Sequence, residues 1–148
     1  LKTLAKECGR IAYEIRMDPT ALHTEQKGDK SLLTVADGTL EELIKRTVTE
    51  KFGGEFIGEE SGTTQSTSHA EYQWIVDPID GTTNFSRGTG EGNYPDLPTW
   101  GISIGLKKDG KPHIGVIYKP QTDELFYAVS GQGPLSKQIN LVKNTHAN

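Results

Sequence analysis

The sequence has only one cysteine, Cys8, among its 148 residues, which excludes an internal disulfide and is typical of a reducing compartment. It has no apolar run near the roughly 20 residues that a membrane-spanning helix requires. It has no basic cluster, and its formal net charge of −4 argues against general nucleic-acid binding. We therefore expect a cytoplasmic protein that binds neither nucleic acid nor membranes.

The composition that remains is typical of one folded domain. Hydrophobic residues make up 33% and charged residues 24% of the chain, and its length is enough for one substantial core. The chain begins at Leu1 without an initiator Met or a signal-peptide pattern. We therefore expect its natural N-terminus to lie upstream.

Two amphipathic helices are predicted first. Apolar residues recur every three to four positions over residues 1–17, and this helix ends before Pro19 and places Cys8 in the core. A second apolar stripe, over residues 40–52, follows Thr39-x-x-Glu42, which has the form of a capping box. Gly53-Gly54 is expected to end that helix.

A mostly antiparallel sheet is predicted to follow the helices. Alternating or β-branched runs indicate strands at Glu55–Ile57, Tyr72–Asp77, Gly101–Leu106, Ile114–Tyr118, Glu124–Val129 and Ile139–Val142. Lys108-Asp109-Gly110-Lys111 is a hairpin signal. Helices followed by antiparallel strands predict the α+β class.

The segment Trp74–Phe85 carries the strongest functional signal. Pro78 lacks an amide donor, so the strand is expected to stop at Asp77 and the chain to turn before Asp80. Two carboxylates that converge without a neighbouring Arg repel each other unless a cation lies between them. Oxygen ligands of this kind suit Mg²⁺, Mn²⁺ or Ca²⁺.

The residues after Asp80 predict an anion site. Gly81-Thr82-Thr83 is expected to open a helix whose amides point back at the cation, which is a favourable arrangement for phosphate. The ordinary alternative is an Asx-type turn, since Asp, Pro and Gly are the commonest turn formers. A cation site and a helix start in the same segment together favour a functional site over an ordinary turn.

Three segments in order resemble the inositol monophosphatase family, which belongs to a Mg²⁺-dependent, lithium-sensitive sugar-phosphatase superfamily. They are Thr34-x-x-Asp37, Gly58-Glu59-Glu60-Ser61 and Asp77–Phe85. The resemblance implies a phosphomonoesterase that hydrolyses inositol monophosphate or a similar sugar or polyol phosphate with Mg²⁺ as cofactor. It also implies helices on one face of the sheet, as the first half of a layered α/β/α/β/α sandwich, and a homodimer for the complete enzyme.

The same resemblance assigns roles to individual residues. Metal ligands are Glu59, Asp77, the backbone carbonyl of Ile79, and Asp80. Asp37 and Thr82 are catalytic and orient the attacking water, and Glu60 has a supporting role or binds a further metal. Phosphate contacts come from Asp80, Gly81, Thr82 and Thr83. Taken alone, Glu59-Glu60 would be a solvated surface pair and Asp37 a helix-start residue; Lys27 either faces the site or is a solvated loop lysine.

Two features depart from the family pattern. The connection over residues 87–99 is several residues longer than usual, which is compatible with a lid or with a solvated loop. The family's second half, with its Trp-Asp motif, does not follow before Asn148. We therefore expect residues 1–148 to be the N-terminal metal-binding domain of a longer enzyme whose C-terminal domain is absent.

Two other functions remain open from the sequence. Haloacid-dehalogenase phosphatases carry Asp-x-Asp-Gly-Thr, but Asp77 and Asp80 here stand three positions apart, with a proline between them. The other alternative is a metal- or phosphate-binding module without catalytic turnover.

Overall fold

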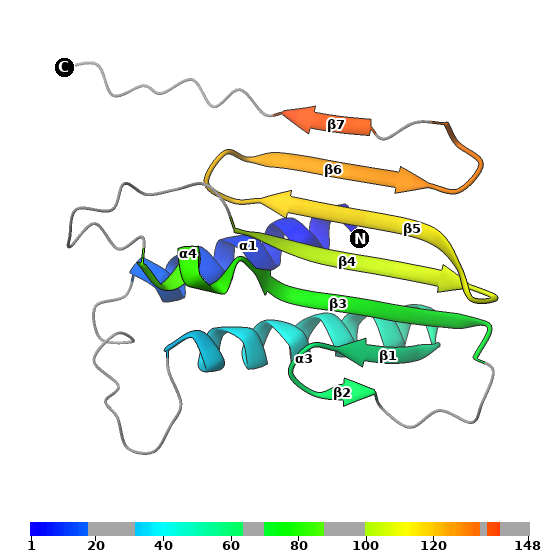
Figure 1. Cartoon of the computed structure of the whole chain (residues 1–148), viewed down its shortest axis with the longest axis horizontal. Coiled ribbons are helices and arrows are strands. Elements are labelled where there is room, and N and C mark those ends of the chain that lie inside the picture. The colour runs from blue at the N-terminus through cyan, green and yellow to red at the C-terminus, as the bar shows by residue number, and fades with distance from the viewer. Residues whose placement is uncertain (18–31, 64–69, 88–99, 134–135, 140–148) are drawn as a thin grey trace.

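The computed structural model describes residues 1–17, 32–63, 70–87, 100–133 and 136–139. Within these ranges, seven strands form one sheet, and two long helices lie against it (Figure 1). The helices are α1 (Lys2–Met17) and α3 (Leu32–Phe52), and the short helix α4 (Thr82–Arg87) follows the third strand. This arrangement confirms the predicted α+β class.

The sheet is antiparallel except at one pair of strands. In chain order its strands are β1 (Glu55–Gly58), β2 (Gly62–Thr63), β3 (Tyr72–Asp80), β4 (Gly101–Lys108), β5 (Lys111–Lys119), β6 (Glu124–Val129) and β7 (Ser136–Ile139). Their order across the sheet is β2-β1-β3-β4-β5-β6-β7, and only β1 and β3 are parallel neighbours. The last strand ends at Ile139, where we had expected it to begin, and residues 140–142 lie outside the described ranges.

Strand β3 corrects the expectation that Pro78 ends the strand. The strand continues to Asp80, although its register against β4 shifts between Asp77, opposite Ser103, and Asp80, opposite Gly101. A proline cannot donate to the ladder, so the irregularity falls where Pro78 and Ile79 interrupt the pairing. The two aspartates therefore flank a bulge within one strand and not a turn after it.

Helix α3 corrects the predicted capping box. The helix begins at Leu32, so Thr39 lies in its interior, where its hydroxyl donates to the carbonyl of Val35 at 2.8 Å. A back-bonded Thr of this kind is a helix-interior arrangement and not a cap. The predicted end is confirmed: Gly53 has a positive φ of 68°, and its amide bonds the carbonyl of Thr49 at 2.9 Å.

The core lies between the two helices and one face of the sheet. It contains, among others, Ala5, Cys8, Ala12, Leu40, Ile44, Val48, Phe56, Trp74, Val76, Ile104, Val116 and Leu125. Cys8 is fully buried, as predicted. Burial of one large aliphatic or aromatic side chain stabilises the fold by about 1.5–3 kcal/mol. The last residue of the predicted second stripe, Phe52, is instead 61% exposed.

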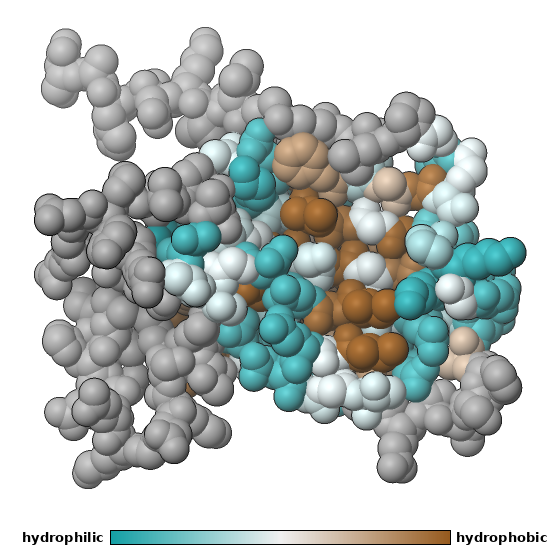
Figure 2. Space-filling view, in the orientation of Figure 1, coloured by the Kyte–Doolittle hydropathy of each residue, from teal (hydrophilic) through white to brown (hydrophobic). Residues whose placement is uncertain are grey.

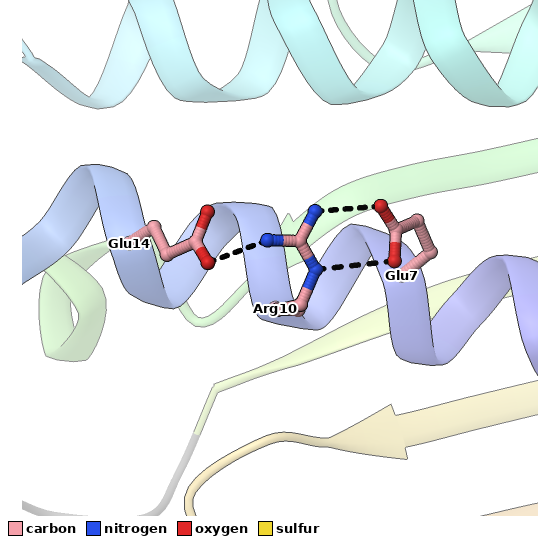
Figure 3. A network of polar contacts seen from close by, with 3 residues as sticks. All are labelled: Glu7, Arg10 and Glu14. Atoms are coloured by element: carbon pink, nitrogen blue, oxygen red, sulfur yellow. Dashed lines mark hydrogen bonds and ion pairs between the residues drawn. The ribbon is translucent and has the colours of Figure 1, made fainter.

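The outward surface of α1 is polar. Arg10 bonds both Glu7 and Glu14, one turn away on either side, and all three side chains are exposed (Figure 3). Such pairs stabilise a helix by only about 0.3–0.5 kcal/mol each. None of the described helices is long and apolar enough to cross a membrane.

The other face of the sheet is less covered. Ile75 on β3 is 37% exposed, and Ile117 on β5 is 49% exposed. Figure 2 shows hydrophobic residues gathered over the middle of the molecule in this view. By strand alternation, Ile75, Asp77 and Ile117 lie on the face opposite to the buried Trp74 and Val76.

Candidate metal and phosphate site

Glu59 and Asp77 meet because β1 and β3 are parallel neighbours. Gly58 pairs with Val76, and the amide of Glu59 donates to the Val76 carbonyl at 3.2 Å. Glu59, directly after β1, and Asp77 on β3 therefore lie at the same edge of the sheet. Parallel strands bring their carboxyl ends to one edge, so two acidic residues far apart in the sequence become neighbours.

The pKa of Asp77 shows the clearest effect of the neighbouring acidic groups. Burial, the hydrogen bond and charge of Glu59, and the charge of Asp80 together raise the pKa of Asp77 to about 7, against a smaller opposing contribution from the Ile79 amide. Its Oδ1 atom is buried and has no hydrogen-bond partner. A buried carboxylate oxygen without a donor is costly, because the charge loses its hydration without compensation.

Asp37 approaches the same cluster from helix α3. Its side chain is 3% exposed. Burial and the negative charges of Glu60, Asp77, Glu59 and Glu41, in that order, raise the pKa of Asp37 to about 7. The charges of Glu59 and Glu60, in the turn after β1, and of Asp77 on β3 reach Asp37, so the helix contributes a further acidic group to this end of the sheet.

The segment after Asp77 continues directly into helix α4. The Ile79 side chain is fully buried, and Asp80 is exposed at the end of the strand. Gly81 has a φ of 92°, and its carbonyl accepts the amides of Asn84 and Phe85 at 2.9 and 3.0 Å. The helix therefore begins at the predicted position, and its positive end lies next to Asp80.

Helix α4 is anchored to α1 by a buried arginine. The Nε of Arg16 donates to the carbonyl of Phe85 at 3.0 Å, and Arg16 is only 1% exposed. Its guanidinium also lies 6.0 Å from the Phe85 ring and 5.9 Å from the Trp100 ring. The Phe85 and Trp100 rings pack edge to face at 4.9 Å. Phe85 and Arg16 thus support the segment, roles that the sequence analysis did not assign.

Sequence reasoning also missed Glu41. This residue is 3% exposed, and its carboxylate accepts the amides of Glu60 and Ser61, both at 2.9 Å. The signal was present: Asp37, Glu41, Ile44 and Val48 follow each other at helical spacing, so Glu41 belongs to the buried stripe. An acidic residue within a buried stripe indicates a specific polar partner.

The predicted site residues divide into two groups. Asp37, Glu59, Glu60, Asp77 and Asp80 lie close enough for the charges of their neighbours to shift the pKa of Asp37 or Asp77. Gly81, Thr82 and Thr83 form the start of α4 directly after them. Lys27, the glycine-rich residues 88–92 and the rest of the long connection lie outside the described ranges, as do His23, His69 and His146. His113 is a strand residue in β5.

The acidic cluster has the chemistry of a divalent-cation site. Among the described residues, no three acidic, histidine or cysteine side chains form a ready-made cage for a metal ion. The donors nevertheless suit Mg²⁺, because they are carboxylate oxygens that repel one another, and because Oδ1 of Asp77 is buried without a donor. A cation bound there would compensate both costs.

An acidic cluster at the carboxyl ends of two parallel strands, beside a helix start, defines a candidate centre for cation-dependent chemistry on an anionic ligand. The sequence profile of the inositol monophosphatase family matches residues 1–148. The chain belongs to the inositol monophosphatase family.

Individual relatives agree with this assignment. The chain is 37% identical over 110 residues to the fructose-1,6-bisphosphatase/inositol-1-monophosphatase of Aquifex aeolicus, which covers 74% of this chain and 38% of the relative. It is 39% identical over 134 residues to inositol monophosphatase 3 of Solanum lycopersicum, covering 82% and 46% of the two chains. The crystal structure of extragenic suppressor protein suhB from Bartonella henselae superimposes with a TM-score of 0.71 at 32% identity, over 93% of this chain and 49% of that one. The chain thus spans less than half the length of each.

Proposed function

We propose that this chain carries the cation- and phosphate-binding part of a Mg²⁺-dependent phosphomonoesterase that hydrolyses inositol monophosphate or a similar small sugar or polyol phosphate. The strongest support is Asp77, whose buried Oδ1 has no donor and whose pKa is raised by burial, Glu59 and Asp80. Family membership and the names of the relatives support a phosphatase-type hydrolase. The family match also favours this activity over a haloacid-dehalogenase mechanism.

Each proposed role follows from position and chemistry. Glu59, Asp77, Asp80 and the carbonyl of Ile79 would hold Mg²⁺, with Glu60 in support. When bound, Mg²⁺ acidifies a water molecule and offsets negative charge on the phosphate. Asp37 and the Thr82 hydroxyl orient the attacking water. The amides of Gly81, Thr82 and Thr83, at the positive end of α4, receive phosphate oxygens and stabilise the charge that develops there. Phosphoryl transfer by positioning and electrostatics requires no covalent nucleophile.

An Asp80→Asn variant tests the metal assignment. The substitution removes one negative charge from an exposed strand end, so the fold should persist. We expect phosphate release from inositol monophosphate by the complete enzyme to require Mg²⁺ and to fall about 100-fold or more in the variant. Glu42→Asn, on the exposed side of α3, is the control and should behave like the wild type. Turnover of Asp80→Asn within a few-fold of the wild type would refute the assignment.

A metal- and phosphate-binding module without turnover is the second candidate, because the chain spans less than half the length of its relatives. Mg²⁺ binding by calorimetry without phosphate release would identify that function. For the complete enzyme we also propose a cytoplasmic homodimer that lithium inhibits. Insensitivity to millimolar lithium would weaken the phosphatase assignment.

A further inference from the structure

Glu41 connects helix α3 to the turn that carries Glu59. Its two carboxylate oxygens accept two successive backbone amides, Oε2 from Glu60 and Oε1 from Ser61, each at 2.9 Å. Hydrogen bonds from amides to a charged, buried carboxylate are stronger than those between neutral groups. Both oxygens of Glu41 are therefore used to hold backbone.

The turn is shaped to receive this carboxylate. A Cβ atom at Gly58 would lie 2.3–2.5 Å from the carboxyl atoms of Glu41, a separation that real Cβ atoms do not show. The φ of Gly58 is not positive, so the turn requires glycine for space and not for backbone conformation. The absence of a side chain at Gly58 allows Glu41 to reach the amides beyond it.

The turn is also held from its other side. The amide of Glu59 donates to the Val76 carbonyl on β3 at 3.2 Å, one residue before Asp77. The Gly58–Ser61 segment is thus fixed between α3 and β3. The Glu59 side chain lies near Asp77, because its hydrogen bond and its charge both raise the pKa of Asp77. Loss of the α3 contact would leave the Glu59 bond to Val76 and the pairing of Gly58 with Gly62 to orient the turn.

We propose that Glu41 is a positioning residue that fixes the Gly58–Ser61 turn so that Glu59 and Asp77 can bind one divalent cation together. This inference rests on the proposed function. Each oxygen of Glu41 already accepts an amide of the turn, so we assign Glu41 to positioning and not to the ligand set. Residues that orient metal ligands from outside commonly affect metal affinity by 10–100-fold.

The test compares Glu41→Gln with Glu42→Gln in the full 148-residue chain. Both variants remove one negative charge from the same helix, but Glu42 is exposed and Glu41 is buried. Gln keeps the length of Glu, but it has one oxygen that can accept a backbone amide where Glu has two. Amide hydrogen exchange by NMR reports the turn directly, and calorimetric titration with Mg²⁺ reports the consequence.

We expect Glu41→Gln to lower the exchange protection of the Glu60 and Ser61 amides at least about tenfold, with the amides of Ile104 and Val116 in the sheet unchanged. Its dissociation constant for Mg²⁺ should rise about 10–100-fold. Glu42→Gln should change neither quantity. If Glu41→Gln fails to fold, Glu41→Asp, which keeps the charge but shortens the side chain, should show the same pattern.

The outcomes separate this inference from the proposed function. Lost amide protection with unchanged Mg²⁺ affinity would overturn the positioning role and leave the proposed metal site standing. Unprotected Glu60 and Ser61 amides in the wild type would overturn the contact itself. A wild type that binds no Mg²⁺ while its turn amides are protected would overturn the proposed function, and with it the metal-binding consequence drawn here.

Discussion

Replacement of Asp77 by Asn should stabilise the metal-free chain at pH 8 and leave its stability at pH 4 almost unchanged. In the folded chain the pKa of Asp77 is raised from 3.8 to about 7, mainly by burial and by Glu59. Below about pH 4 the carboxyl group is protonated in both folded and unfolded chains, so no stability is lost. Between about pH 4 and pH 7 the unfolded chain ionises this group while the folded chain keeps it protonated, so stability falls over this range and stays at its lower level above pH 7.

The magnitude follows from the size of the pKa change. A change of one pH unit in a pKa corresponds to about 1.4 kcal/mol, so the full effect at pH 8 would be about 4 kcal/mol. Asp77 is only half-buried, and solvent screens part of the repulsion, so we expect about 1–2 kcal/mol. The amide of the Asn side chain can also donate to Glu59. For a chain of this size the gain corresponds to a Tm increase of about 3–8 °C.

Thermal unfolding in EDTA at pH 4 and pH 8 measures this effect. Asp109→Asn is the control, because it removes the same charge from the exposed hairpin turn, where a positive φ of 49° suits Asn. The control should show no such difference between the two pH values. A loss of stability for Asp77→Asn at pH 8, or equal gains at both pH values, would show that the acidic cluster is not under electrostatic strain.

Two further predictions concern the packing around the site. Arg16→Met should lower the free energy of unfolding by about 1.5–3 kcal/mol, because it removes the buried hydrogen bond to the Phe85 carbonyl. Urea unfolding measures this loss, and the m-value should not change. A loss below about 0.5 kcal/mol would contradict the anchoring of α4 by Arg16. Burial raises the pKa of the Cys8 thiol to about 12, so the native chain should resist a thiol reagent at pH 8 and react fully once unfolded in urea. Rapid native labelling would mean that α1 opens readily.

Local patterns predicted much of the fold. The Asp109-Gly110 pair lies in a two-residue hairpin turn with φ values of 49° and 73°, as its sequence indicates. The helix ends at Met17 and Phe52 also follow from nearby proline and glycine. These features depend on a few adjacent residues, so sequence alone contains the necessary information.

The errors arose where a local rule has more than one structural outcome. The missing amide of Pro78 predicts the end of a strand, but β3 accommodates it as a register shift and continues to Asp80. Thr39-x-x-Glu42 predicts a helix start, although the helix already begins at Leu32. Glu41 was overlooked because its partners lie 19 and 20 positions further along the chain, and only the fold brings them to it.

In the acidic cluster, the free energy that repulsion and burial cost the metal-free chain is also the free energy that a bound cation can recover. Burial and mutual repulsion raise the pKa values of Asp37 and Asp77, so the metal-free chain is weakened at neutral and high pH. A cation that binds only the folded chain would stabilise it by mass action, and most strongly where the carboxylates are ionised. Mg²⁺ should therefore raise the Tm of the wild type more at pH 8 than at pH 5, and by more than it raises that of Asp77→Asn. On this argument the same substitution stabilises the empty site and weakens the occupied one, a change of sign that packing alone would not produce.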